Sequence, residues 1–295
     1  MASTEHQEIH PQAGLSTTRR RLRTFRLPVL LVALFAVMTV IAGINQLVAP
    51  VPVLALPVGV GLAVAAVVAY RRLSGAVELR QDIPELDKAD RRARLRQGTL
   101  LGFGLFTGLM ALIAVFGGWQ AVSWGSFGGL LGAVGMMASV AVAEELLFRG
   151  VLFRIMEERL GTVISLVVSM LLFGATHLVN VNATLWGVLS IALTGGAMTT
   201  AAYVATRSLW LPISLHFAWN FTHVGIFGVT LSGSDAPVHG LLNVTLTGPS
   251  ALTGGIFGPE ASLLALVVCL VPTIVLLRRA KRTGQIRPRR RTSSS

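Results

Sequence analysis

The chain has 295 residues, of which 53% are hydrophobic and only 13% charged, and its mean hydropathy is +0.69. A soluble domain cannot bury that much apolar surface, whereas a protein with several membrane spans exposes it to lipid. The formal net charge of +12 would suit nucleic-acid binding only if the basic residues formed one continuous face, and they do not.

About eight apolar stretches have the length that a helix needs to cross a bilayer. The first is longer than the apolar core of a signal peptide and has no evident cleavage site, so we interpret it as a true span. The sequence therefore predicts an all-α, polytopic membrane helix bundle with about eight transmembrane helices. In chain order, they cover residues 27–49, 51–70, 99–119, 126–148, 162–180, 184–206, 208–230 and 260–278.

The basic residues are distributed asymmetrically about these spans. All 25 Lys and Arg residues lie within 19–26, 71–96, 149–159, 207 and 278–291. With eight spans, these segments all fall on one side of the membrane, which is the positive-inside pattern. We therefore predict a multi-pass protein of the cell membrane with both termini cytoplasmic (N-in/C-in). Its basic tails are expected to contact anionic lipid headgroups, and a nucleic-acid partner is not expected.

A small set of polar side chains lies within the predicted spans. An ionisable group in the bilayer costs several kcal/mol unless it is paired or lines a wet cavity, so each is a candidate functional residue. The set is Glu144, Glu145, Arg149, His177, His216, Asn220 and His223.

Helical spacing separates the two adjacent glutamates. Glu145 and Arg149 are four residues apart, so they share a helix face and can form an ion pair. Glu144 is rotated by about 100° from Glu145 and can point into a cavity. The charge of one glutamate is thus compensated while the other stays accessible.

The same reasoning predicts where the other polar groups meet. His216 and Asn220 are four residues apart and share a face. Glu144 and His177 are equally far from a turn expected near Gly161, so an antiparallel hairpin places them at the same height. We expect Glu144, His177, His216 and Asn220 to converge inside the membrane.

This set of groups suits hydrolysis of an amide bond. A carboxylate and an imidazole can activate a water, and a second imidazole and an amide can stabilise an oxyanion. A metal such as zinc, held by His, His and Glu, would also fit. The chain has no nucleophile-elbow serine and no H-E-x-x-H motif, and its lone cysteine is Cys269, which makes soluble serine, cysteine and zincin chemistries poor interpretations.

Three short motifs resemble those of the CPBP, or Abi, family of intramembrane proteases, which includes the CAAX prenyl endopeptidases. E-E-x-x-x-R is present as Glu144–Arg149, F-x-x-x-H as Phe173–His177 and H-x-x-x-N as His216–Asn220. Each motif alone is weak, but all three occur in order, each within a predicted span. The resemblance covers roughly residues 125–230.

The resemblance implies an intramembrane endopeptidase that cleaves a membrane-associated peptide or protein. In this family, a glutamate and a histidine activate the water, the second histidine and the asparagine stabilise the oxyanion, and the remaining pair supports the site. Here the resemblance assigns water activation to Glu144 and His177. It assigns the oxyanion to His216 and Asn220, and the supporting role to Glu145 and Arg149. The resemblance leaves open whether a divalent metal such as zinc takes part or the mechanism is metal-free.

On this basis, the chain divides into five parts. Residues 1–26 form a cytoplasmic basic tail, and 27–120 form three transmembrane helices with a cytoplasmic charged loop at 71–98. The catalytic core of four further helices covers 121–230. The last parts are 231–278, an outer loop and an eighth transmembrane helix, and 279–295, a second cytoplasmic basic tail.

Two interpretations from other classes compete with the protease. Buried carboxylates and histidines also carry protons in transporters, but the chain shows no repeat between its halves and no pair of interrupted helices. A non-catalytic binding or immunity protein could keep the same fold, although the intact motifs argue against a silent site.

The predicted topology can be tested by cysteine labelling or reporter fusions. Residues 50, 122, 182 and 245 should all report the outer side of the membrane, because they lie in predicted loops without basic residues. A cytoplasmic signal from residue 245 would contradict the count of eight spans.

Overall fold

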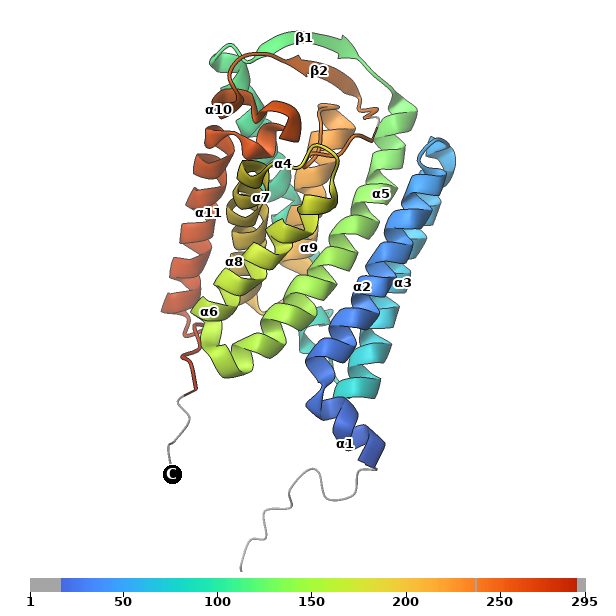
Figure 1. Cartoon of the computed structure of the whole chain (residues 1–295), viewed down its shortest axis with the longest axis vertical. Helices are drawn as coiled ribbons and strands as arrows, with labels where there is room; N and C mark the ends of the chain where they lie inside the picture. Colours follow the sequence, from blue (N-terminus) through green and yellow to red (C-terminus); the bar gives the residue numbers. More distant parts are fainter. Residues whose placement is uncertain (1–16, 237, 291–295) are drawn as a thin grey trace, which may run out of the picture.

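The computed structural model describes residues 17–236 and 238–290. The predicted basic tails therefore lie partly outside the described residues, in 1–16 and 291–295. The described chain is a bundle of helices with a two-stranded sheet at one end (Figure 1). Helix α1 and the C-terminal end of α11 lie at the opposite end, as an even number of membrane crossings requires.

The chain alternates long helices with short irregular segments. The α-helices are α1 (Thr17–Thr24), α2 (Arg26–Val48), α3 (Pro52–Glu78), α4 (Arg91–Val115), α5 (Phe127–Glu145), α6 (Arg154–Ala175), α7 (Leu185–Ile191), α8 (Ala197–Thr206), α9 (Trp210–Phe221), α10 (Ser250–Thr253) and α11 (Leu263–Arg282). Three π-helical segments are η2 (Leu146–Phe153), η4 (Ala192–Gly196) and η5 (Thr222–Ile226). The 3-10 turns are η1 (Pro84–Leu86), η3 (Thr176–Val179), η6 (Gly255–Phe257) and η7 (Pro259–Ala261), and the strands are β1 (Trp119–Trp124) and β2 (Leu242–Leu246).

The polytopic helical bundle predicted from the sequence is confirmed. Among the described residues, six helical segments are long and apolar enough to cross a membrane. One of them, Phe127–Val179, runs for 53 residues but reverses at Gly161, so it contains both predicted spans 126–148 and 162–180. The predicted span 208–230 holds α9 and η5, which are shorter, with 12 and 5 residues. The count of eight and the orientation of the termini stay predictions.

The predicted charged loop 71–98 is much shorter in the structure. Helix α3 continues to Glu78 and α4 begins at Arg91, so only residues 79–90 connect them. Hydropathy ends a span at its first charges, but a helix can continue beyond the bilayer if its polar side chains find partners. Here Glu78 pairs with Arg154 at 2.5 Å and with Arg26 at 3.3 Å.

The short connection is itself held by a buried carboxylate. Glu85 accepts hydrogen bonds from Arg80 at 2.7 and 2.5 Å and from the Tyr70 hydroxyl. Burial raises the pKa of the Glu85 carboxyl, but these hydrogen bonds outweigh it and hold that pKa below its ordinary value. A carboxyl with a lowered pKa stabilises the folded state at neutral pH, and this contribution is lost as the pH falls through the folded-state pKa.

The segments predicted to be outer loops are more ordered than the sequence suggests. The predicted loops 120–125 and 231–259 contain β1 and β2, which pair antiparallel, with Trp124 opposite Leu242. The last predicted span, 260–278, begins later, at Leu263, because η7 precedes it and the Ser262 hydroxyl caps α11 by accepting from the Ala265 amide at 3.0 Å. Glu260 therefore lies in a turn before the helix.

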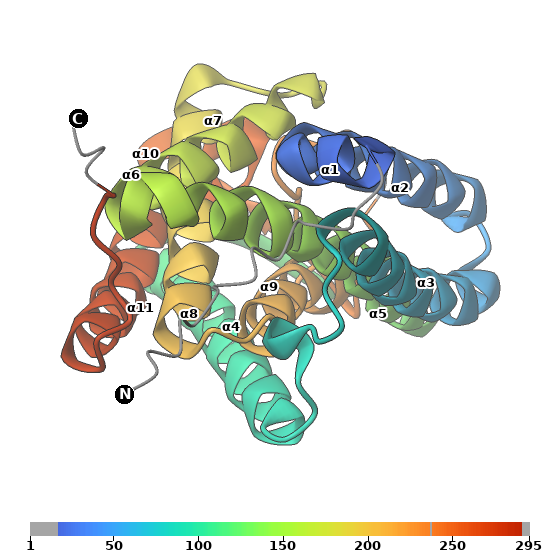
Figure 2. The same cartoon turned by 90° about the horizontal axis from the view of Figure 1, so that it is seen from below.

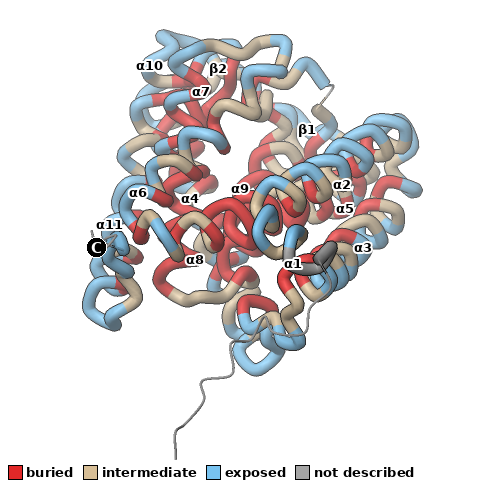
Figure 3. Tube along the Cα trace, turned by 60° about the horizontal axis from the view of Figure 1, so that its bottom comes forward, coloured by how far each residue is buried: buried red, intermediate tan, exposed pale blue. Residues whose placement is uncertain are grey.

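The helices differ greatly in how deeply they are buried. Within the most apolar window of Leu185–Thr206, 83% of residues are buried inside the protein, against 17% for Arg26–Val48. Figure 3 shows buried residues gathered along α8 and α9 and exposed ones on the outer helices. Seen from below, α2 and α3 lie on one side and α11 on the other, with α8 and α9 between them (Figure 2).

Glycines allow some of these helices to touch through their backbones. A Cβ atom on Gly59 of α3 would lie 2.2 Å from the carbonyl carbon of Gly135 in α5. Small residues permit such close contacts between membrane helices. The contact fixes α3 against α5, the helix that ends at the two glutamates.

The reversal at Gly161 depends on glycine. Its φ of 75° and ψ of 171° lie in a region that is open essentially only to glycine, and a Cβ there would lie 2.7 Å from the backbone nitrogen of Arg289. We therefore expect Gly161→Ala to destabilise the protein by about 1–3 kcal/mol, measured by thermal unfolding in detergent. Gly61→Ala is the matched control, because nothing lies within 4 Å of the added Cβ in helix α3. Equal unfolding temperatures for the two variants would contradict this account of the turn.

Candidate active site

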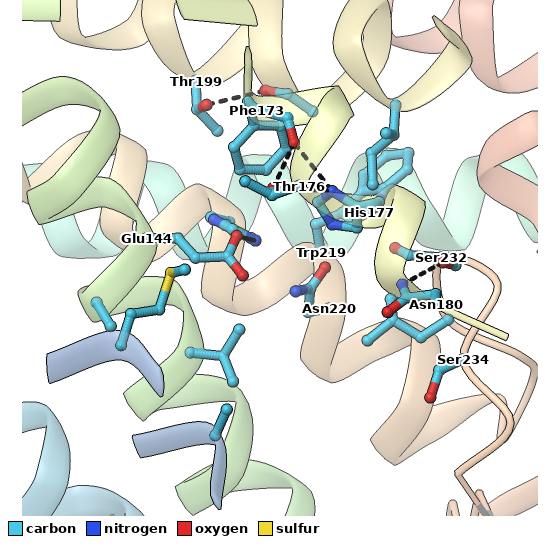
Figure 4. A pocket seen from close by; sticks show the side chains of 18 of the residues that line it. Glu144, Phe173, Thr176, His177, Asn180, Thr199, Trp219, Asn220, Ser232 and Ser234 are labelled. Carbon is cyan, nitrogen blue, oxygen red and sulfur yellow. Dashed lines mark hydrogen bonds and ion pairs between the residues drawn. The ribbon is translucent and has the colours of Figure 1, made fainter. Parts of the chain in front are cut away.

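A cavity of about 420 Å³ lies inside the bundle, between α2, α5, α6, α8 and α9. Its wall contains the four polar residues that the sequence predicted to converge: Glu144, His177, His216 and Asn220. They come from three separate parts of the chain, and Figure 4 shows Glu144, His177 and Asn220 around the same space. The structure thus brings the end of α5, the end of α6 and the middle of α9 together.

The predicted ion pair between Glu145 and Arg149 forms in the interior. Both side chains are fully buried, and Arg149 Nη1 lies 3.0 Å from Glu145 Oε1. The same guanidinium donates to the Gly196 carbonyl at 2.8 Å and to the Thr200 hydroxyl at 3.2 Å. Each of the three guanidinium nitrogens therefore donates to a protein acceptor, which offsets part of the cost of burying the charge.

Glu145 also holds a histidine. Its Oε1 accepts a hydrogen bond from His216 Nδ1 at 2.9 Å. Because the carboxylate accepts, Nδ1 carries the proton, and the other ring nitrogen, Nε2, faces Glu144 with a separation of 3.8 Å from Oε2. That distance is too long for a direct hydrogen bond. Sequence spacing did not reveal the contact between Glu145 and His216, because it joins two helices 71 residues apart.

Glu144 differs from Glu145 in its surroundings. Its side chain is 18% exposed and lines the cavity, whereas that of Glu145 is 0% exposed. The carboxylate of Glu144 points toward the space that it shares with Asn220 (Figure 4). The two neighbouring glutamates thus take different positions, one toward the cavity and one toward Arg149, as their helical rotation predicted.

His177 is oriented by its own helix. Its Nδ1 lies 3.0 Å from the Phe173 carbonyl oxygen, four residues earlier. A carbonyl can only accept, so Nδ1 donates, and Nε2 is the ring nitrogen left to act in the cavity. The F-x-x-x-H spacing therefore fixes the tautomer of the histidine as well as its face. His177 is half-buried and lines the cavity.

Two π-helical segments lie directly at these groups. Segment η2 begins after Glu145 and contains Arg149, and η5 follows the last turn of α9. π-helical turns are rare and occur frequently at functional sites. They change which residues face one another, whereas the spacing of the sequence motifs is that of a regular α-helix. Even so, the ion pair of the first motif is retained.

One predicted candidate does not reach the cavity. His223 is fully buried, its Nε2 donates to the Thr230 carbonyl at 2.7 Å, and its ring stacks on Phe106 with centroids 4.4 Å apart. It does not line the cavity. Its role is in packing α9 and η5 against α4.

One cavity residue was missed from the sequence. Glu260 lines the cavity and is only 3% exposed. It stood at the first position of the predicted span 260–278, where an acidic residue looks like part of a polar loop. The useful signal was an acidic side chain directly before an apolar stretch, between Pro259 and Leu263.

The cavity was also compared with the needs of a metal. Among residues 17–236 and 238–290, no three His, Cys, Asp or Glu side chains are grouped in a way that could hold a metal ion. His216 directs one ring nitrogen to Glu145, and His177 directs one to a backbone carbonyl. The described side chains therefore do not form a preassembled zinc site of the His, His, Glu type.

Comparison with known proteins agrees with the motif analysis. Residues 125–222 match the family model described as type II CAAX prenyl endopeptidase, Rce1-like. This segment of the chain is similar to the Rce1-like CAAX endopeptidases. The matched segment is roughly a third of the chain and includes all three motifs, with every polar residue discussed for the cavity except Glu260 and His223. No curated protein and no solved structure matches the chain.

The apolar helices and the matched segment agree on the class of protein. The chain is a multi-pass membrane protein, and its residues 125–222 are similar to a peptidase family. Helices α1 to α4 and α11 lie outside the matched segment, and α2 nevertheless contributes Phe35, Met38 and Thr39 to the cavity wall.

Loss of the buried arginine should destabilise the protein strongly. We expect Arg149→Ala to lower the free energy of unfolding by about 3–5 kcal/mol, because Glu145 would be left as an unpaired buried charge. Adding Glu145→Gln to that variant should recover part of the loss, and only part, because the Gly196 carbonyl still lacks its donor. Thermal unfolding in detergent measures both, with exposed Arg92→Ala as a control expected to stay within about 0.5 kcal/mol of wild type. If the double variant is no more stable than Arg149→Ala, the pair is not a significant interaction.

Proposed function

We propose that the protein is an intramembrane endopeptidase that hydrolyses a peptide bond of a membrane-associated protein or peptide, with a water activated by Glu144 and His177. The observation that carries this proposal is the separation of the two adjacent glutamates. Glu145 is neutralised by Arg149, while Glu144 opens onto a cavity that an imidazole and an amide also line. The similarity of residues 125–222 to the Rce1-like endopeptidases supplies independent support for peptidase chemistry.

In the first step, Glu144 acts as the general base. A water between Glu144 and the free Nε2 of His177 could give its proton to the carboxylate. The resulting hydroxide attacks the carbonyl carbon of the peptide, and the π electron pair of the carbonyl moves onto its oxygen. The imidazole of His177 orients the water through its lone pair.

In the same step, His216 and Asn220 would stabilise the oxyanion. Asn220 can donate through its amide, and His216 can donate through Nε2 when it is protonated. With His216 protonated, the charges of Glu144, Glu145, Arg149 and His216 sum to zero. Donors fixed before the reaction are worth more than water, since they need no reorganisation.

Collapse of the tetrahedral intermediate completes the reaction. Protonated Glu144 returns its proton to the leaving nitrogen, the carbon–nitrogen bond breaks, and the products are a carboxylic acid and an amine. Glu144 thus acts first as base and then as acid, and no covalent enzyme intermediate is formed.

A lipid-side groove offers a route for a membrane-associated substrate. It is a largely apolar groove of about 580 Å³, formed by residues of α2, η2 and α6. It shares Phe35 and Thr176 with the wall of the cavity, so the two spaces adjoin. A peptide held in the membrane could reach Glu144 this way without passing through water.

The mechanism predicts the effect of removing the base. Glu144→Gln keeps the shape of the side chain, so the protein should stay folded while cleavage falls by roughly 100- to 10,000-fold. His177→Ala should fall comparably, and the double variant should be hardly slower than either single one, because both act on one water. Cleavage of a prenylated CAAX-type peptide by the purified protein is the measurement, with Glu158→Gln as the matched control far from the cavity. Unchanged cleavage by Glu144→Gln would reject Glu144 as the base, whereas no cleavage by the wild type would favour a transporter or a silent binding protein.

A chelator separates this mechanism from a metal-dependent one. Water activation by Glu144 and His177 alone should survive treatment with a strong chelator. Loss of activity on chelation, restored by added zinc, would show that a metal activates the water instead, and the role of Glu144 would then have to be revised.

A further inference from the structure

Glu260 connects two separate parts of the cavity wall. It lies in η7, outside the segment that matches the peptidase family, and its side chain is buried at the edge of the cavity. Its Oε1 accepts a hydrogen bond from the Trp219 indole at 2.8 Å, and its Oε2 is hydrogen-bonded to the Ser232 hydroxyl at 2.5 Å. One partner belongs to α9 and the other to the segment before β2, so a single carboxyl group ties these two segments together.

The turn that carries Glu260 is itself anchored to a neighbouring helix. The Ser190 hydroxyl of α7 donates to the backbone carbonyl of Glu260 at 2.7 Å. The Trp186 indole, at the start of the same helix, donates to the carbonyl of Ala261 at 2.8 Å. These two bonds hold the backbone of η7 in place. The carboxyl group is therefore presented to α9 from a fixed position.

On one side, this contact acts on the asparagine that we propose as an oxyanion donor. Among the described residues, none hydrogen-bonds to the side-chain amide of Asn220, so its direction depends on how α9 is held. The bond from His216 to Glu145 is one restraint on that helix, and the bond from Trp219 to Glu260 is a second. Trp219 directly precedes Asn220, so a rotation of α9 that breaks the second bond also turns the amide.

On the other side, the contact extends toward the histidine that we propose to orient the water. The side-chain amide of Asn180, three residues after His177, donates to the Ser232 carbonyl at 2.7 Å (Figure 4). Ser232 has a φ of 50°, a left-handed conformation that is uncommon for a residue other than glycine. Such a conformation persists where the surrounding structure holds it, frequently at active sites. Here Asn180 and Glu260 hold Ser232 through its carbonyl and its hydroxyl.

A carboxyl group can make both contacts in either protonation state. One oxygen accepts from the indole, because an indole N–H can only donate, and the other oxygen can either accept from a hydroxyl or donate to it. A glutamine offers the same two functions, whereas an apolar side chain of similar length offers neither. The geometry at position 260 thus calls for two hydrogen bonds and for no proton transfer.

We propose that Glu260 is a positioning residue of the peptidase site, which acts through Trp219 to aim the Asn220 amide at the oxyanion. This inference rests on the proposed function. Glu260 touches neither the attacking water nor the scissile carbonyl in this role. A donor loses much of its value when it is misplaced, because a shift of about 1 Å can cost roughly 100-fold in rate.

The test compares two substitutions of Glu260 in purified full-length protein in lipid vesicles, with a farnesylated CAAX-type peptide as substrate. Glu260→Met keeps the approximate length of the side chain but removes both hydrogen bonds. Its kcat should fall by about tenfold or more while KM stays within about twofold of wild type. Glu260→Gln should recover most of that loss. Thr253→Val is the matched control, because it removes a buried hydroxyl of α10 that does not line the cavity.

A double variant distinguishes positioning from a purely structural role. Asn220→Ala should itself lower kcat by roughly 100- to 1,000-fold, and adding Glu260→Met should lower it by less than about twofold more, because the donor that Glu260 aims is already gone. A full further loss in that background would show that Glu260 only supports the fold, and would overturn the inference. A Glu260→Gln variant as slow as Glu260→Met would also overturn it, because the carboxyl group would then take part in the chemistry.

The remaining outcomes separate this inference from folding and from the proposed function. If Glu260→Met does not fold, Trp219→Phe removes the other partner of the same hydrogen bond, and its kcat is compared in both backgrounds. A wild-type kcat in the folded variant would overturn the inference. A wild type that gives no product beyond that of Glu144→Gln would instead reject the proposed function, and the inference with it.

Discussion

The site depends on how one buried arginine is satisfied. Arg149 has no exposed surface, and its guanidinium binds Glu145 on the same helical segment and Gly196 and Thr200 on the neighbouring one. Through Glu145, the network continues to His216 on α9. A buried charge that loses its partner costs several kcal/mol, so these elements cannot separate without that cost. The arginine therefore fixes the relative positions of α5, α8 and α9, which carry most of the polar wall of the cavity.

This arrangement also explains why two adjacent carboxylates can serve different purposes. One helical step turns Glu144 away from Arg149 and toward the cavity, whereas Oε1 of Glu145 is bound by both Arg149 and His216. The aromatic ring of Phe173 lies 4.7 Å from the guanidinium carbon of Arg149 and belongs to the residue whose carbonyl orients His177. The first and second motifs are thus in direct contact, and the tautomer of the histidine depends on the same packing that shields the arginine.

Much of the site could be predicted from the sequence because it depends on spacings between residues that are close together in the chain. The i, i+4 spacing predicted the ion pair of Glu145 and Arg149, and the position of Gly161 predicted that Glu144 and His177 lie across a hairpin. Contacts between helices are different, because periodicity gives a face but not the partner of that face. The bond from Glu145 to His216 was missed for that reason.

The ends of the helices were also predicted imprecisely from the sequence, for a related physical reason. Hydropathy marks where the lipid ends, but helices α3 and α4 continue into the charged region because Glu78 and Glu85 find arginine partners there. At the outer end, η7 precedes α11 and leaves Glu260 in a turn, although its side chain reaches the cavity. In both cases the local structure depends on a side chain that is distant in sequence, which the average hydropathy of a short window does not include.

Helix α9 shows how these two kinds of contact act together. His216 donates to Glu145, and Trp219, three residues later on nearly the same face, donates to Glu260. Two hydrogen bonds to carboxylates from separate elements, made by residues about 60° apart around the helix, restrain rotation of α9 about its axis. Asn220 follows Trp219 directly, so its direction into the cavity is set by both carboxylates. One of them belongs to the matched domain and the other to the turn before α11, and the geometry of the candidate oxyanion site is therefore a property of the whole bundle.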